Sequence, residues 1–169
     1  EAGPPGWRQV PRPGVVLGAG GAARAVVWSL LDRGVEEILV VNRTSSRAES
    51  LADGFGPRVQ PAEWRDLPNA LTPASLLINT TTLGMAGAPP LDIPLANLPV
   101  AATVCDIVYV PLTTPLLRDA RQRGNRVVDG LGMLLHQAVP GFAAWFGATP
   151  QVTADLRALV VADIERHAC

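Results

Sequence analysis

Short apolar runs alternate with longer amphipathic stretches along most of this chain, and this alternation limits the possible folds more than any other feature. The runs are rich in Val, Ile and Leu, and they lie at Val15–Leu17, Ile38–Val41, Leu76–Asn79, Thr103–Val108 and Arg126–Val128, with a weaker one at Arg58–Gln60. Continuous apolar runs of this kind are typical of parallel strands that are buried on both faces. The pattern therefore predicts six strands.

Helices are expected between and after these strands. Three stretches end before a glycine that we expect in the left-handed conformation: Ala22–Arg33 before Gly34, Ser45–Asp53 before Gly54, and Thr114–Arg123 before Gly124. Two more helices are expected at Leu131–Phe146 and Val152–Arg166. Because strands and helices alternate, the predicted fold class is α/β: a Rossmann-like, doubly wound, mostly parallel six-stranded sheet with helices on both faces.

Composition excludes several classes of function. With 169 residues the chain is long enough for one core, and its net charge of -1 provides no field for gripping nucleic acid or an anionic membrane. All 14 basic residues are Arg. Schiff-base chemistry, a covalent pyridoxal phosphate link and the phosphate-binding loop that ends in Gly-Lys all need a lysine amine, so this chain can perform none of them.

The cysteines and the first residues bear on location and on domain organisation. Cys105 and Cys169 form neither a disulfide framework nor a metal pattern, so we expect a cytoplasmic protein without a metal site. Residues 1–14 hold four prolines and three glycines and are expected to be an extended lead-in. The chain starts at Glu1 and not at Met, which suggests an excerpt of a longer protein.

The first apolar run leads directly into a glycine-rich turn. Gly18, Ala19, Gly20, Gly21, Ala22 and Ala23 match the pattern G-x-G-x-x-A between a strand and a helix. Gly18 permits the tight turn, and Gly20 lets a pyrophosphate approach the backbone at the helix start, where N–H groups are unpaired. The pattern predicts a dinucleotide site; the alternative is a glycine-rich turn that binds nothing.

The end of the second run indicates which dinucleotide binds. An NAD site has a carboxylate there for the ribose 2′-hydroxyl, whereas this chain has Asn42, Arg43, Thr44 and Arg47. Two charge-assisted contacts to a 2′-phosphate would favour NADP over NAD by about two to four orders of magnitude. The alternative interpretation makes Thr44 a helix cap and both arginines solvated surface.

Five segments together resemble the cofactor-binding half of the shikimate dehydrogenases. They are GAGGAARAV at Gly18–Val26, NRTSSRA at Asn42–Ala48, INTTTLGM at Ile78–Met85, DIVYVPLTTPLL at Asp106–Leu117 and VDGLGMLLHQA at Val128–Ala138. The resemblance implies an oxidoreductase of aromatic amino-acid biosynthesis that reversibly reduces 3-dehydroshikimate to shikimate with NADPH. It also implies that Gly18 to Ala22 hold the pyrophosphate, that Asn42, Arg43, Thr44 and Arg47 surround the ribose phosphate, that Ile107 and Gly130 lie near the nicotinamide, and that Tyr109 and Gln137 contact the substrate.

In this family the acid that protonates the product alkoxide is a lysine paired with an aspartate on a preceding substrate domain. We therefore expect no catalytic residue in this chain, and we expect it to be inactive alone. The expected division is a lead-in at 1–14, an NADP-binding domain at 15–148, and a C-terminal helix at 149–169 that packs toward the substrate domain. A quinate/shikimate dehydrogenase and a free-standing NADP-binding module remain alternatives, and the oligomeric state is open, with a homodimer as one alternative.

Five positions need separate comment. Pro140 lies inside the helix that carries Gln137 and predicts a kink or an early break there. Thr81 and Thr82 replace the small residues or proline usual in the family. His136 is expected on a different helix face from Gln137, and Asp129 is expected to cap a helix instead of acting in catalysis.

Overall fold

Six parallel strands form one sheet in the computed structural model, which describes residues 12–167. The strands are β1 (Gly14–Leu17), β2 (Ile38–Asn42), β3 (Val59–Glu63), β4 (Leu76–Asn79), β5 (Thr103–Asp106) and β6 (Arg126–Val128). Their order is β3-β2-β1-β4-β5-β6, and every neighbouring pair is parallel. This is the Rossmann strand order, so the predicted fold class is confirmed.

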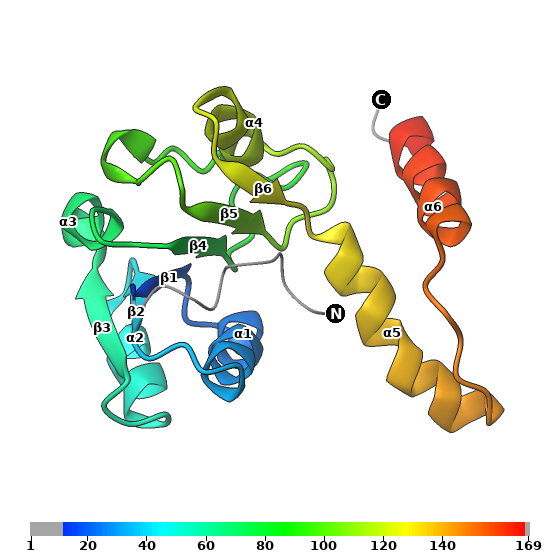
Figure 1. The fold of residues 1–169 in the computed structure, drawn as a ribbon, viewed down its shortest axis with the longest axis horizontal. Coiled ribbons are helices and arrows are strands. Elements are labelled where there is room, and N and C mark those ends of the chain that lie inside the picture. The colour runs from blue at the N-terminus through cyan, green and yellow to red at the C-terminus, as the bar shows by residue number, and fades with distance from the viewer. Residues whose placement is uncertain (1–11, 168–169) are drawn as a thin grey trace.

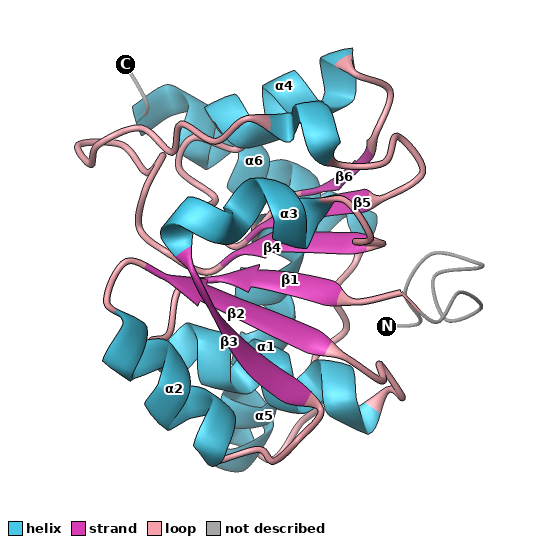
Figure 2. Cartoon of the chain, turned by 90° about the vertical axis from the view of Figure 1, so that its left-hand side faces the viewer, coloured by secondary structure: helices cyan, strands magenta, loops and turns pink. Residues whose placement is uncertain are grey.

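Helices cover both faces of the sheet (Figure 2). They are α1 (Gly21–Asp32), α2 (Ser45–Asp53), α3 (Leu67–Leu71), α4 (Pro115–Gln122), α5 (Leu131–Phe146) and α6 (Ala154–His167), with short 3₁₀ helices at Trp64–Asp66 and Leu95–Asn97. Of the expected lead-in, residues 1–11 lie outside the described part of the chain. No helix in the described residues is long and apolar enough to span a membrane.

Each face of the sheet has its own core, because alternate residues of a buried strand point to opposite sides. Val16, Val40 and Ile78 pack against α1 and α2, and Leu17, Leu77 and Val104 pack against α3 and α4. All of these strand residues are at most 7% exposed. The two cores hold the six strand ends in fixed positions along one edge of the sheet.

One local prediction was wrong, and so was one of the two alternatives of another. The backbone at Gly54 is right-handed, with φ −71°, and the left-handed residue after α2 is Gly56, with φ 82°. The chain continues for one more turn, with the amide N–H groups of Phe55 and Gly56 bonded to the Ala52 carbonyl, before it reverses. At Pro140 the sequence predicts a kink or an early break, and the early break does not occur: α5 is one helix from Leu131 to Phe146 (Figure 1). Pro140 has no N–H to donate within the helix, and it is exposed, so the missing helical hydrogen bond lies on the solvent side of α5.

The last two helices project beyond the sheet. In Figure 1, α5 runs away from the end of β6 and α6 returns beside it. Leu131 is the one fully buried residue of α5, while Trp145 is 81% exposed and Phe146 67%. An apolar helix with so little burial leaves a large hydrophobic surface open.

Candidate functional site

The carboxyl ends of the strands form the candidate site, at the point where the strand order reverses between β1 and β4. The glycine-rich turn starts there. The amide N–H of Gly18 donates to the Val41 carbonyl at 2.8 Å, which joins the ends of β1 and β2. Gly18 has φ 102°, and a Cβ atom would lie 2.8 Å from Thr80 Oγ1, so only glycine fits this position.

The next two glycines are not crowded by the protein. A Cβ atom at Gly20 or Gly21 would have no protein atom within 4 Å. Gly20 is the N-cap of α1, and no side chain caps the unpaired N–H groups that follow. Ala22 is exposed and Ala19 is half-buried beside this opening. The turn therefore presents an open helix N-terminus, which suits a phosphate group.

A second open helix start lies at the end of β2, next to the first. Thr44 occupies the N-cap position of α2, but its side chain makes no capping hydrogen bond, so the alternative role as a cap is not supported. The Asn42 side chain instead holds this turn, because Nδ2 donates to the Thr44 carbonyl at 2.9 Å. The Arg47 amide donates to the Thr44 carbonyl at 3.1 Å, and in the described residues no side chain accepts from the other N–H groups at the start of α2.

Arg43 and Arg47 flank this second helix start. Both are exposed, and within residues 12–167 neither guanidinium makes a hydrogen bond or an ion pair. Glu63 lies opposite Asn42 in the β2–β3 register, but its carboxylate binds Arg65 at 2.9 Å. Within the described residues no carboxylate thus competes with an anionic ligand for the two arginines, so this helix start can accept a phosphate group.

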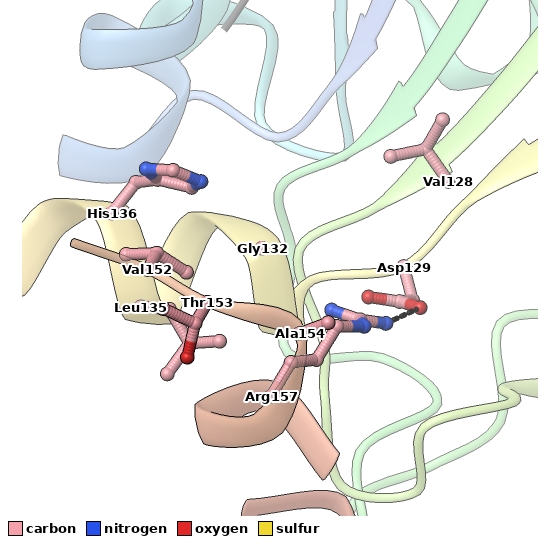
Figure 3. A pocket seen from close by; sticks show the side chains of 9 residues that line it. All are labelled: Val128, Asp129, Gly132, Leu135, His136, Val152, Thr153, Ala154 and Arg157. Carbon is pink, nitrogen blue, oxygen red and sulfur yellow. Dashed lines mark hydrogen bonds and ion pairs between the residues drawn. The ribbon is translucent and has the colours of Figure 1, made fainter.

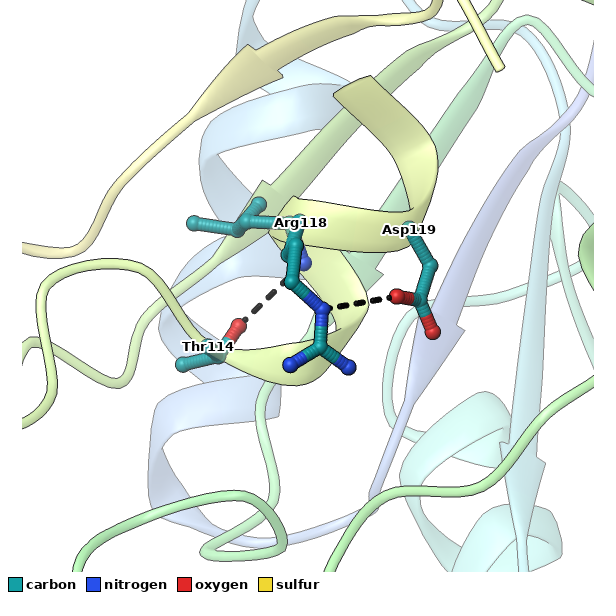
Figure 4. A network of polar contacts seen from close by, with 4 residues as sticks. Thr114, Arg118 and Asp119 are labelled. Atoms are coloured by element: carbon teal, nitrogen blue, oxygen red, sulfur yellow. Dashed lines mark hydrogen bonds and ion pairs between the residues drawn. The ribbon is translucent and has the colours of Figure 1, made fainter. Parts of the chain in front are cut away.

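The loops after β4 and β5 are joined by buried side chains. Asn79 and Asp106 are opposite each other in the β4–β5 register, and Asn79 Nδ2 donates to Asp106 Oδ1 at 2.9 Å. Thr114 Oγ1, at the N-cap of α4, donates to Asp106 Oδ2 at 2.7 Å. The same oxygen accepts from the Leu117 amide at 3.3 Å, a contact that Figure 4 draws. In the same figure Arg118, on the exposed side of α4, pairs with its neighbour Asp119 and takes no part in this buried cluster.

Burial changes the acidity of two side chains here. Burial raises the pKa of Asp106 above its usual range, and the hydrogen bonds from Thr114, Val108 and Asn79 partly oppose that rise. Burial, and secondarily the nearby Asp106 carboxylate, raises the pKa of the Cys105 thiol to about 12. Cys105 is therefore a protonated core thiol and not a nucleophile.

The residues expected near the nicotinamide meet at the same edge. A Cβ atom at Gly130 would overlap the carbonyl group of Ile107, so the start of α5 packs directly on the backbone after β5. Tyr109 is half-buried in that loop, whereas Gln137 is exposed on α5. No hydrogen bond joins Tyr109 and Gln137 in the described residues, so the structure does not bring these two side chains together.

A cavity of about 400 Å³ lies on the other side of α5, between that helix and the start of α6 (Figure 3). His136 lines it with Gly132 and Leu135, whereas Gln137 does not, so the two neighbours do lie on different helix faces. The N-cap of α5 is Gly130 and not Asp129, but Asp129 Oδ1 accepts from the Leu131 amide at 3.1 Å and so binds an N–H group of the first turn. Asp129 Oδ2 binds Arg157 of α6 at 2.5 Å.

Sequence reasoning missed Asn79, Thr81 and Thr114 as parts of the site. The available signal was positional: Asn79 and Asp106 are the polar ends of two apolar runs that form adjacent parallel strands. The carboxyl ends of such strands meet at one edge of a sheet.

Comparison with known proteins agrees with this geometry. Residues 12–85 match the family model for shikimate / quinate 5-dehydrogenase, and residues 130–160 match the model for the shikimate 5′-dehydrogenase C-terminal domain. A curated relative, shikimate dehydrogenase (NADP(+)) of Rhodopseudomonas palustris strain BisB5, is 60% identical over 168 residues, which cover 99% of this chain and 59% of the relative. The chain thus spans a little under three fifths of that relative's length.

Solved structures show the same likeness. Quinate dehydrogenase from Corynebacterium glutamicum, in complex with NAD, has a TM-score of 0.82 and 32% identity over 90% of this chain and 56% of its own. Shikimate 5-dehydrogenase from Thermus thermophilus, in complex with NADP(H) and shikimate, has a TM-score of 0.72 and 37% identity over 94% of this chain and 56% of its own. With both ends of the chain matched and the fold and glycine turn in place, the chain belongs to the shikimate/quinate 5-dehydrogenase family.

Proposed function

We propose that this chain is the cofactor-binding portion of an NADPH-dependent shikimate dehydrogenase that reversibly reduces 3-dehydroshikimate to shikimate. The observation that carries the proposal is that, within residues 12–167, Arg43 and Arg47 have no ion-pair partner beside the uncapped start of α2, where no carboxylate ends β2. The relative from Rhodopseudomonas palustris carries NADP(+) in its name, and the Thermus thermophilus structure contains NADP(H) and shikimate.

The residues fit the cofactor in three places. Gly18 to Ala22 would hold the pyrophosphate. No protein atom fills the space where a side chain at Gly20 or Gly21 would lie, and no side chain caps the N–H groups at the start of α1. Arg43 and Arg47, with Asn42 and Thr44, would hold the 2′-phosphate. Ile107 and Gly130 would border the nicotinamide. When bound, the cofactor supplies the hydride.

Substrate contact is proposed for Tyr109 and Gln137. A phenol and an amide can hydrogen-bond a polyol without adding charge. Hydride transfer to a ketone leaves an alkoxide that needs an acid, and the chain has no lysine to match the family's acid. We therefore assign the acid to a substrate domain outside these residues, and we propose that 15–148 is the NADP-binding domain and that 149–169 packs toward the substrate domain.

The exposed aromatic surface of α5 supports this division. Phe142 and Phe146 stack with their ring centroids 4.5 Å apart, and Trp145 beside them is 81% exposed. Surface of this kind marks an interface. A substrate domain would cover it in the proposed enzyme, and a homodimer is the alternative occupant. The sparse cysteine usage supports a cytoplasmic location.

Two titrations and one assay test the proposal. NADPH should bind the 169-residue chain at least about a hundredfold more tightly than NADH, since two charge-assisted contacts are lost with the 2′-phosphate. The chain alone should not reduce 3-dehydroshikimate. Equal binding of NADPH and NADH would refute the cofactor assignment, and turnover by the chain alone would refute the assignment of the acid to another domain.

A quinate dehydrogenase is the second candidate, because the structure with the TM-score of 0.82 is one and is bound to NAD. The two candidate enzymes would bind different cofactors: NADPH carries a negatively charged 2′-phosphate that would lie at the end of β2, and NADH does not. Tighter binding of NADH than of NADPH would favour the quinate enzyme, whereas the arginine pair predicts the opposite order.

A further inference from the structure

Asn79 and Asp106 occupy the same position at the ends of neighbouring strands. They face each other in the register of β4 and β5, Asn79 is 0% exposed and Asp106 is 1% exposed. Their side chains are joined at 2.9 Å, and the Ile107 amide donates to the Asn79 carbonyl at 3.1 Å. Two polar side chains thus lie at the boundary between the apolar core and the loops that follow.

Asn79 organises the loop after β4. Its Oδ1 accepts from the amide of Thr81 at 3.0 Å and from Thr81 Oγ1 at 2.7 Å, and its Nδ2 also donates to the Leu83 carbonyl at 3.2 Å. Thr81 Oγ1 in turn accepts from the Leu83 amide at 3.1 Å. The Asn79 amide group, together with Thr81 Oγ1, therefore sets the path of residues 79–83.

Asp106 organises the loop after β5 in the same way. Its Oδ1 also accepts from the Val108 amide at 3.0 Å, and its Oδ2 accepts from Thr114 Oγ1, which caps α4. One carboxylate thus fixes both ends of the loop 106–114. The start of α5 presses on the same loop from another side, because Gly130 packs on Ile107.

Stability alone does not account for this arrangement. Asp106 is buried and has three neutral hydrogen-bond donors and, in the described residues, no cationic partner. Burying a carboxylate is costly, and well-packed apolar residues often stabilise a core at least as well as buried ionic groups do. The pair instead fixes the loop after β4 relative to the loop after β5, because the hydrogen bond between the two side chains forms only when both loops are in position.

We propose that Asn79 and Asp106 are positioning residues, a brace that sets the two loops bordering the nicotinamide half of the cofactor. The inference rests on the proposed function, since it takes the nicotinamide to lie beside Ile107 and Gly130. The brace is on the far side of β1 from the arginines at the end of β2. It therefore acts on the nicotinamide end and not on the adenosine end.

The test compares two ligands on the 169-residue chain. NADPH carries both ends of the cofactor, and adenosine 2′,5′-bisphosphate carries the adenosine end only. Asp106→Ala and Asn79→Ala should each weaken NADPH binding about tenfold, the worth of roughly one hydrogen bond, and leave the bisphosphate within about twofold. The double variant should bind NADPH no more weakly than whichever single variant binds it more weakly, because the two residues act as one unit.

A conservative variant separates position from charge. In Asp106→Asn the amide oxygen can accept from Asn79 and Val108, and the amide nitrogen can donate to Thr114, so NADPH binding should be restored to within about threefold of wild type. If Asp106→Ala does not fold, Thr81→Val removes one link of the same loop and should show the same selective loss.

The possible failures are distinguishable. A wild-type chain that binds neither ligand refutes the proposed function. A wild-type chain that binds both, with Asp106→Ala or Thr81→Val unchanged toward NADPH, refutes the brace. An equal loss of both ligands also refutes it, because the pair would then support the whole domain and not the nicotinamide end.

Discussion

Gly130 packs against the backbone of Ile107 so closely that a methyl group at position 130 would overlap the Ile107 carbonyl and lie 2.9 Å from the carbonyl oxygen of Val108. Its φ of −77° is available to any residue, so the need for glycine comes from contact and not from backbone conformation. The start of α5 and the loop after β5 therefore form one rigid unit.

Gly130→Ala should destabilise the chain by about 1–3 kcal/mol, because backbone atoms cannot move aside as a flexible side chain can. Gly132→Ala is the matched control, two residues along the same helix, where a Cβ atom would meet nothing within 4 Å. That variant should gain up to about 1 kcal/mol from the helix propensity of alanine. Urea denaturation of both variants measures the difference, and equal stabilities would contradict the packing argument.

Gly20→Ala should separate folding from binding. No protein atom lies within 4 Å of the added Cβ, and φ is −93°, so the free energy of unfolding should stay within about 0.5 kcal/mol of wild type. The same methyl group would occupy the space proposed for the pyrophosphate, so NADPH affinity should fall at least about tenfold. Denaturation and a fluorescence titration on one preparation give both values. Unchanged NADPH affinity would mean that the pyrophosphate lies elsewhere.

How far the sequence predicts this structure depends on whether each feature is local. The strands were predicted well because burial on both faces makes them continuous apolar runs, and β4 was placed at Leu76–Asn79 without error. The short helix α3 was missed because five residues that include Pro68 carry no helical period. The Asn79–Asp106 pair joins residues 27 apart and depends on the β4–β5 register, so no local pattern contains it.

Arg47→Gln should weaken NADPH binding about tenfold or more and leave NADH binding unchanged, because the lost contact is to the 2′-phosphate alone. Arg58→Gln is the control: it removes the same charge from an exposed arginine that precedes β3, at the amino ends of the strands. Its NADPH affinity should match wild type. Parallel titrations decide the matter, and a similar loss in both variants would indicate a general charge effect.

The Cys105 thiol should react with a disulfide reagent such as dithionitrobenzoate only when the domain opens. Its pKa of about 12 leaves almost no thiolate at about pH 8, and the half-buried side chain packs against the core from β5. A Cys169→Ser background makes Cys105 the one thiol of the chain. The labelling rate should rise with urea in step with unfolding, and fast labelling without denaturant would contradict the buried placement.

Asp106→Asn should show a dependence of relative stability on pH. Because burial raises the pKa of Asp106 in the folded state above that of the unfolded state, the folded protein binds the proton more tightly. The contribution of Asp106 to the free energy of unfolding is therefore greatest below the pKa of the unfolded state, about 3.9. It falls as pH rises through the raised pKa of the folded state. Asparagine does not titrate, so the stability of Asp106→Asn relative to wild type should increase as pH rises above about 4 and level off once pH exceeds the raised pKa of the folded state. Urea denaturation of both proteins across this range measures the change, and a relative stability that falls with pH would show that hydrogen bonding, not burial, dominates at Asp106.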